Sequence, residues 1–337
     1  MRNDSRYGKA DKTDRERGVT MNQHIPALHY LPGDKYRPLH PVQTVTAVKY
    51  VQIAPGQDVH LEGLIFDRDR NMLCTNIYDR KIYKIDKDTK EVSILYAFDD
   101  YPRFCPTAVK IHKDGRLFIA GVDLKSDPLG EYGGILVVNP DGSNPHQIID
   151  HWNIDDLVFD NDGGFYFTNY IGNPQNPCGT IEYVSQDLKT ITTVVPHLAS
   201  PNGLALSPDG TVLWITETAA GVLHRIDLKN QNHNTTPYKF EGFYGPDSCS
   251  VDEDGNLYVA MSRQGRIMVF NPNGFLIGQV VTPGSEEGIS LGTTHAMVHP
   301  DTNMLYFTAH DVHFDAGANI FCAGSYAKGH SKAYQFL

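Results

Sequence analysis

The segment PNGLALSPDGTVLWIT, residues 201–216, contains the pattern that decides the fold. A polar residue follows Pro201, apolar residues alternate up to Leu206, and an Asp-Gly pair precedes a second apolar run. Asp-Gly pairs suit tight hairpins because both residues tolerate positive φ angles. Aromatic and β-branched residues such as those of 213–216 favour strands. The segment therefore predicts a β-hairpin whose first strand begins beside Asn202.

This hairpin pattern recurs six times along the chain. The six openings are LEGLIFD (61–67), PTAVKIH (106–112), IDDLVFD (154–160), PNGLALS (201–207), PDSCSVD (246–252) and THAMVHP (294–300). Their second residues, at 62, 107, 155, 202, 247 and 295, are 45, 48, 47, 45 and 48 residues apart. A period near 45 with three or four short strands per unit is typical of a β-propeller. We expect an all-β fold, a six-bladed β-propeller with four-stranded antiparallel blades.

The ends of the chain complete this organisation. Residues 1–23 are too poor in apolar side chains to bury, so we expect a disordered tail. Residues 24–337 are then a single propeller domain. The sixth unit runs out of chain after its third strand, while Val42–Ile53 and Lys332–Leu337 are unassigned strand-like segments. We expect one of them to complete the sixth blade as a terminal strand, which closes the ring and leaves no open sheet edge.

Composition excludes several classes of protein. The chain has 337 residues with 29 Lys+Arg and 40 Asp+Glu, a net charge of −11, whereas nucleic-acid binding requires a basic face. Apolar runs are all shorter than the ~18 residues of a membrane span. The five cysteines are scattered without a CxxC pair, and the N-terminus has no apolar signal segment, so we expect a cytoplasmic location. We therefore predict a small-molecule partner and no nucleic acid or membrane; the oligomeric state has no signal in the sequence.

The second residues of the six units form a candidate site. The first strand of each propeller blade lines the central channel, so equivalent positions form a ring near the channel mouth. The ring is predicted to contain Glu62, Thr107, Asp155, Asn202, Asp247 and His295. The longest loops predicted on the same face are 121–133, 170–179 and 310–318, and long loops on rigid scaffolds commonly carry binding sites.

The ring residues suit a hard divalent cation. Three carboxylates facing one channel repel one another by roughly 3 kcal/mol per pair at ~5 Å and an effective dielectric of ~20. A bound cation removes that cost, and all-oxygen ligands favour Ca²⁺, with Mg²⁺, Mn²⁺ or Zn²⁺ as possible substitutes. The alternative for each single residue is a turn or cap role.

At these residues the sequence resembles the gluconolactonase, senescence marker protein (regucalcin) and luciferin-regenerating enzyme family, and within it the drug-responsive bacterial lactonase branch. The resemblance runs from about Val42 to the end of the chain, through LEG (61–63), IDD (154–156), Asn202-Gly203, GPDS (245–248) and AKGH (327–330). It implies a catalytic Ca²⁺ held by Glu62, Asn202 and Asp247, with Asp155 beside it. Sugar lactonases usually have Asn at the position of Asp155, which makes simple sugar lactones a less secure substrate.

The resemblance implies a calcium-dependent lactonase, a hydrolase acting on carboxylic ester bonds. We expect the metal to polarise the lactone carbonyl and Asp155 or Asp247 to act as base or nucleophile. Ser248 matches a residue important in the related lactonase and is a third catalytic candidate, with a turn hydroxyl as its alternative. Thr107 and His295 are candidates for substrate contact.

Three other functions stay open at this stage. The same centre could hydrolyse phosphotriesters or aryl esters, or the chain could be a non-enzymatic metal-binding propeller that presents its face to a protein. A strictosidine synthase-like condensation would use a glutamate base and no catalytic metal, and a tightly bound ion would argue against it.

Several motifs are interpreted as structural. GISLG (288–292) fits the nucleophile pattern G-x-S-x-G, but no strand–turn–helix context surrounds Ser290. The Asp160 and Asp252 turns resemble the start of EF-hand loops but lack the final Glu, so we expect hairpin turns. His310 and His313 are expected on a solvent-exposed mouth loop without a role.

Overall fold

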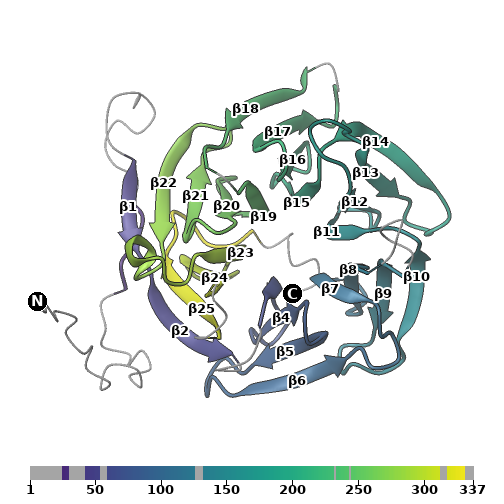
Figure 1. The fold of residues 1–337 in the computed structure, drawn as a ribbon, viewed down its shortest axis with the longest axis horizontal. Coiled ribbons are helices and arrows are strands. Elements are labelled where there is room, and N and C mark those ends of the chain that lie inside the picture. Colours follow the sequence, from purple (N-terminus) through teal and green to yellow (C-terminus); the bar gives the residue numbers. More distant parts are fainter. Residues whose placement is uncertain are drawn as a thin grey trace, which may run out of the picture.

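The chain forms six blades of four antiparallel strands arranged around a common centre, and one of these six sheets has a fifth strand (Figure 1). The computed structural model describes residues 25–29, 42–53, 59–125, 132–230, 233–242, 244–311 and 317–330. The expected tail at 1–23, the second candidate closing strand at 332–337 and His313 lie outside these residues. The predicted six-bladed β-propeller is confirmed.

Each blade repeats one up-and-down order, from an inner strand at the channel to an outer strand at the rim. Blade 1 contains β3 (Leu61–Phe66), β4 (Met72–Asn76), β5 (Lys81–Ile85) and β6 (Val92–Ala97). Blade 2 contains β7 (Cys105–Ile111), β8 (Leu117–Val122), β9 (Gly134–Val138) and β10 (His146–Asp150). Blade 3 contains β11 (Ile154–Phe159), β12 (Phe165–Asn169), β13 (Gly179–Val184) and β14 (Ile191–Leu198).

The second half of the ring continues the pattern. Blade 4 contains β15 (Pro201–Leu206), β16 (Val212–Glu217), β17 (Val222–Asp227) and β18 (Thr235–Lys239). Blade 5 contains β19 (Pro246–Val251), β20 (Leu257–Met261), β21 (Arg266–Phe270) and β22 (Leu276–Val281). Blade 6 contains β23 (Gly292–Val298), β24 (Met304–His310) and β25 (Ala318–Gly324) and is completed by β2 (Val48–Ile53).

Of the two segments expected to close the ring, the N-terminal one, Val42–Ile53, does so. Strand β2 pairs antiparallel with β25 and so supplies the fourth strand of blade 6. Strand β1 (Gln43–Thr46) was not foreseen as a separate element: it pairs in parallel with β22 as a fifth strand of blade 5 (Figure 1). One short segment thus covers the outer edges of two neighbouring blades, edges that would otherwise offer unpaired backbone groups.

Burial follows distance from the channel. Every residue of the inner strands β3, β19 and β23 is buried, whereas the outer strands β6 and β18 are largely exposed or half-buried. The hydrophobic core therefore lies between the faces of adjacent blades; one cluster joins Ile65 of blade 1, Val109 of blade 2 and Met297 of blade 6. Helix is limited to turns such as η4 (Ser285–Glu287), and no helix in the described ranges is long and apolar enough to cross a membrane.

The GISLG motif (288–292) and the Asp160 and Asp252 turns have structural roles, as expected. Ser290 follows η4 and precedes β23, so no helix follows it as a nucleophile elbow requires. Asp160 and Asp252 lie in hairpin turns, where the Asp160 N–H donates to the Gly164 carbonyl and the Asp252 N–H to the Asn256 carbonyl.

Candidate active site

A β-bulge lies at the same place in every inner strand. The pairing of the inner strand with the second strand shifts register in all six blades, between positions 62 and 65, 106 and 108, 154 and 157, 201 and 204, 246 and 249, and 293 and 296. A bulge adds an unpaired residue and re-aims the local side chains. The predicted ring residues Glu62, Thr107, Asp155, Asn202 and Asp247 all fall at this irregularity.

The register changes the sixth ring position. Leu204 pairs with Ile215 in blade 4, and Ala296 pairs with Phe307 in blade 6, so these two residues are equivalent. Counting back from them, Thr294 matches Asn202 and His295 matches Gly203. The alignment of the six units predicted from the sequence was therefore wrong by one residue in blade 6: Thr294, not His295, completes the ring. His295 is fully buried one position further along the strand.

Glycine after the ring residue lets adjacent inner strands approach closely. A Cβ on Gly203 would lie 2.6 Å from the Ser248 Cα of the next blade, and one on Gly63, whose φ is +55°, would lie 2.8 Å from the Ala108 Cα. Both distances are too short for any side chain. The Glu62-Gly63 and Asn202-Gly203 pairs thus combine an oxygen ligand with the close contact that brings it to the axis.

Threonines on the second strands fix the bulges. The Thr216 hydroxyl accepts from the Gly203 N–H at 2.7 Å and donates to the Asp247 carbonyl at 2.6 Å, which links blade 4 to the ring residue of blade 5. Thr168 and Thr308 accept in the same way from the N–H groups of Asp156 and His295. These bonds satisfy backbone groups that the irregular pairing would leave unpaired.

Thr107 uses its hydroxyl within this framework. Its Oγ1 donates to the Ile154 carbonyl of the next blade at 2.9 Å, and its side chain is buried. The structure thus gives Thr107 a position between blades, and its predicted contact with substrate stays a prediction.

The three ring carboxylates perturb one another. Burial raises the pKa of Glu62 well above its usual value, with further contributions from the charges of Asp247 and Asp155. Burial, then the charge of Asp247, likewise raises the pKa of Asp155. Burial raises the pKa of Asp247 to about 7, although the Ser248 N–H and the Asn202 side chain hydrogen-bond to it. Sequence reasoning expected these groups to converge; their mutual electrostatic effect agrees with that expectation, which stays a prediction.

Two unpartnered oxygens give a test of metal binding. Glu62 Oε2 and Asn202 Oδ1 are buried without a hydrogen-bond partner in the described part of the chain. Buried acceptors without donors are costly, and a cation would satisfy both. Among the described residues, no three His, Cys, Asp or Glu side chains already form a metal-binding group. The donor set fits a hard cation in its chemistry, with the Asn202 amide as one of its members.

Ser248 lies directly beside the ring. Its backbone N–H donates to Asp247 Oδ1 at 3.1 Å, the residue is buried, and its backbone lies against Gly203. It occupies the position after the ring residue, equivalent to Asp156 and His295 in their blades.

Sequence reasoning missed a histidine pair at the channel mouth. His60 Nε2 lies 3.2 Å from Glu62 Oε1, and its ring contacts the His310 ring at a centroid distance of 4.3 Å. His310 was expected on an exposed loop, but it ends strand β24 and is only 5 % exposed. Burial lowers its pKa to about 4. The signal for His60 was its place two residues before Glu62, because strand alternation puts such residues on one face.

Two further groups near the ring were not foreseen. Burial and then the charges of Asp155, Asp247 and Glu62 raise the pKa of Tyr170. Below the ring, Lys110 Nζ contacts Asp156 Oδ1 at 2.9 Å, and Asp156 is fully buried. This ion pair joins blades 2 and 3.

The fold is a six-bladed propeller whose inner strands carry acidic and other oxygen-bearing side chains at equivalent positions. Comparison with known proteins gives its family. A family profile described as "SMP-30/Gluconolactonase/LRE-like region" matches residues 145–311. A protein named Lactonase drp35 from Staphylococcus haemolyticus (strain JCSC1435) is 42% identical over 332 residues, covering 94% of this chain and 99% of that protein. The chain belongs to the SMP-30/gluconolactonase/LRE-like family.

Other relatives agree with this assignment. Lactonase drp35 from Staphylococcus aureus (strain MRSA252) is 42% identical over 306 residues, covering 88% of this chain and 91% of that protein. The solved structure of the calcium-binding protein regucalcin from Agrobacterium tumefaciens matches with a TM-score of 0.66 at 17% identity, covering 87% of this chain and 99% of that one. A gluconolactonase from Xanthomonas campestris matches with a TM-score of 0.64 at 17% identity, covering 86% and 99%. The two structural matches support the fold alone.

Proposed function

We propose that this protein is a calcium-dependent lactonase that hydrolyses a cyclic ester at the mouth of the central channel. The observation that carries the proposal is the set of oxygen donors at the bulges of four blades: Glu62, Asn202 and Asp247 are buried, and Asp155 is half-buried. The similarity to proteins named Lactonase drp35 supports the lactone as substrate class.

The four oxygen-bearing side chains would hold the cation. Ca²⁺ is our first choice because it accepts a variable number of oxygen ligands, with Mg²⁺, Mn²⁺ and Zn²⁺ as substitutes. When bound, such an ion polarises a carbonyl oxygen as a Lewis acid. The two unpartnered atoms, Glu62 Oε2 and Asn202 Oδ1, are the specific support for a ligand at this place.

The chain's own residues then divide the remaining tasks. Asp247, a buried carboxylate that accepts from the Ser248 N–H, is our first candidate to take a proton from water. Asp155 is the second carboxylate that could do so, and either one could instead attack the carbonyl carbon directly. Direct attack would expel the ring alkoxide and leave an anhydride between the aspartate and the substrate acyl group, which water then hydrolyses. After a single turnover in H₂¹⁸O, label in the enzyme carboxylate would show direct attack with hydrolysis at the aspartate carbon, whereas a general base can place label only in the product.

The surrounding residues position these groups. His60 hydrogen-bonds to Glu62 and holds its carboxylate in one orientation. The Ser248 N–H does the same for Asp247. Tyr170, in the loop after β12, is a further candidate for substrate contact because the charges of the ring carboxylates act on it, and Thr107 and His295 stay candidates for such contact.

A lactone panel at fixed pH, with and without a chelator, tests the proposal. We expect lactone hydrolysis that is lost on chelation and restored by Ca²⁺. Phosphotriesters and aryl esters belong in the same panel, because hydrolysis of these alone would assign the site to the alternative substrate class. Metal binding without turnover of any ester would make the chain a non-enzymatic metal-binding propeller.

We also propose a cytoplasmic location. All five cysteines are free thiols, which supports a reducing compartment.

A further inference from the structure

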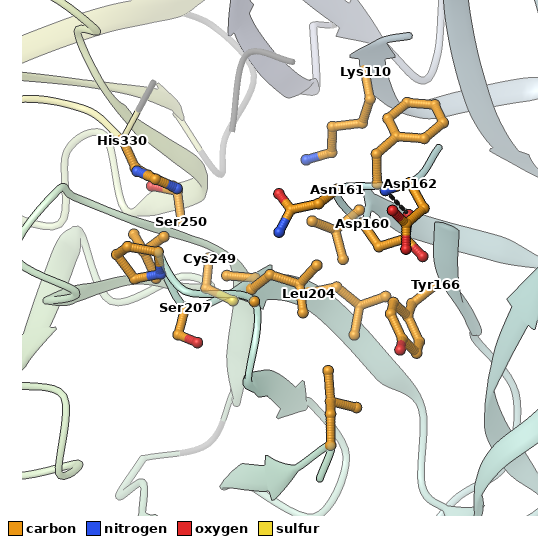
Figure 2. Close-up of a pocket in the computed structure, with 18 of the residues that line it drawn as sticks. Lys110, Asp160, Asn161, Asp162, Tyr166, Leu204, Ser207, Cys249, Ser250 and His330 are labelled. Atoms are coloured by element: carbon orange, nitrogen blue, oxygen red, sulfur yellow. Dashed lines mark hydrogen bonds between the residues drawn. The ribbon is translucent and has the colours of Figure 1, made fainter. Parts of the chain in front are cut away.

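The channel contains a second tier of side chains beyond the acidic ring. The position three residues after each ring residue holds Ile65, Lys110, Val158, Ala205, Ser250 and Met297, which we call the lower tier. Five of these six residues, all but Ile65, line a cavity of about 270 Å³ (Figure 2). No ring residue lines it. The cavity extends to the hairpin turns at Asn161 and Pro208, at the end of the inner strands opposite the ring.

Most of the cavity wall is apolar. Val158 and Met297 of the lower tier are joined there by Leu204, Leu206 and Tyr166. Small-molecule sites are usually lined in this way, with a few polar groups that fix orientation, and range over ~300–1,000 Å³. The volume here therefore suits a small ligand with an aliphatic body.

Two polar groups in the wall offer hydrogen-bond donors. Ser250 is 6 % exposed, and its hydroxyl has no hydrogen-bond partner among the described residues. The ammonium of Lys110 has three donors, and Asp156 is the carboxylate it contacts in the described part of the chain. Figure 2 shows Lys110, Ser250 and Asn161 around the same open space. A buried hydroxyl without a partner is costly, and an acceptor on a ligand would remove that cost.

The charges around the cavity favour a neutral ligand. The charge of Lys110 is already offset by Asp156, and Asp160 and Asp162 also line the cavity. An anionic head would therefore meet an excess of carboxylates, whereas a cationic head would meet the Lys110 ammonium. A carbonyl acceptor is neutral and so avoids both penalties.

We propose that this lower-channel cavity is a second binding site, separate from the acidic ring, for a small neutral aliphatic compound with a carbonyl acceptor. The carbonyl contacts Lys110 and Ser250, and the aliphatic body lies against Val158, Leu204 and Met297. The site does not depend on the lactonase activity proposed for the ring.

Methionine NMR on the full chain, with and without added Ca²⁺, tests this site directly. The Met297 methyl lines the cavity and is one of seven methionines, so its signal, assigned with Met297→Leu, reports occupancy of this place. Three probes share one chain length and differ in head group: N-methylhexanamide, hexanoate and hexylamine. We expect saturable shifts of the Met297 signal with the amide at millimolar concentration, and affinity about ten-fold lower for both charged probes.

Variants locate the contacts. Ser250→Ala removes the unpartnered donor with little change of volume, and we expect amide affinity to fall about five-fold. Ala205→Leu fills part of the cavity and should abolish the Met297 shift. Ser93→Ala, on the exposed outer strand β6, is the matched control and should bind like the wild type.

Three outcomes would overturn the proposal. If the Met297 signal does not move with any of the three probes, the cavity is not a binding site. If hexanoate or hexylamine binds more tightly than the amide, the ligand is not a neutral compound. Unchanged affinity in Ser250→Ala removes the role of its hydroxyl, even if Ala205→Leu does not fold.

Discussion

At the scale of single residues, Asp247 is a buried ring carboxylate with hydrogen-bonding neighbours. It is 7 % exposed, accepts from Ser248, and shares its surroundings with Asn202. These neighbours hold the Asp247 carboxylate, which is proposed both to bind the cation and to accept a proton. A substitution of similar size at this position therefore tests the chemistry of the carboxylate with little change in packing.

Asp247→Asn should abolish catalysis while the fold survives. The amide is similar in size but neither takes a proton nor carries the charge that retains a cation, so we expect kcat/KM to fall by about 10²–10⁴-fold. Lactone hydrolysis and metal content after gel filtration are the measurements. Asp209→Asn, at an exposed turn of the opposite face, is the control. Full activity in Asp247→Asn would refute the site.

His60→Phe should weaken metal binding without unfolding the channel mouth. The phenyl ring keeps the contacts with His310 and Tyr78 but loses the hydrogen bond to Glu62. Partners that orient metal ligands are worth about 10–100-fold in affinity. Calcium titration calorimetry measures the loss, and His60→Gln, which restores a donor, should recover part of it. Wild-type affinity in His60→Phe would leave the histidine with a packing role only.

At the scale of elements, bulges and closing strands determine whether the ring forms. The bulge turns an ordinary inner strand into one that presents a ring residue, and the threonine of the second strand holds it there. The closing strands then fix the blades in place.

Thr216→Val should distort the bulge of blade 4. Valine matches threonine in shape but leaves the Gly203 N–H and the Asp247 carbonyl without their partner. A buried group left unpaired costs about 1–3 kcal/mol, so we expect a lower Tm together with reduced turnover. Thr235→Val, exposed on outer strand β18, should change neither. Equal behaviour of the two variants would show that the hydroxyl is dispensable.

Deletion of residues 42–53 should give insoluble protein. It removes β2 from blade 6 and β1 from blade 5, so two sheet edges become available for pairing with other chains. The soluble fraction and gel filtration report the result. A deletion of residues 1–23 is the control and should leave a soluble protein. A soluble, folded protein lacking 42–53 would contradict this account of closure.

At the scale of the whole molecule, the acidic ring makes the stability of the fold depend on pH and on metal binding. Burial raises the folded-state pKa of Asp247 to about 7, against ~3.9 for an unperturbed aspartate. Because the carboxyl binds its proton more tightly in the folded state, it adds to the free energy of unfolding. This contribution is fully present below the pKa of the unfolded chain, and it is lost as pH rises through the folded-state pKa of about 7. Glu62 and Asp155 act in the same direction.

Calcium should therefore stabilise the protein increasingly as pH rises. The pKa values of buried His295 and His310 are lowered below 6.5, so below that pH these two residues make the folded protein more stable as pH rises. The informative window is thus from pH 6.5 to about pH 8. There we expect the Tm of chelator-treated protein to fall with pH, and the gain in Tm on adding Ca²⁺ to grow. Asp247→Asn should flatten both trends, and a calcium effect that shrinks with rising pH would contradict the ligand assignment.

The sequence by itself determined the repeat, the number of blades and the identity of five ring residues. Asp-Gly turns and alternating apolar residues are local signals, so they recur visibly at each unit and predict each hairpin without knowledge of the others. The oxygen-bearing residues at 62, 155, 202 and 247 could be recognised because they recur at one place in that repeat.

Only the tertiary structure decided what meets across blades. The strand register moved the sixth ring position from His295 to Thr294, and packing brought His60 to His310 and Lys110 to Asp156. The parallel strand β1 and the lower-channel cavity likewise depend on how neighbouring sheets contact one another. Such contacts join residues tens to hundreds of positions apart, and their energies come from close packing and burial, which no local pattern records.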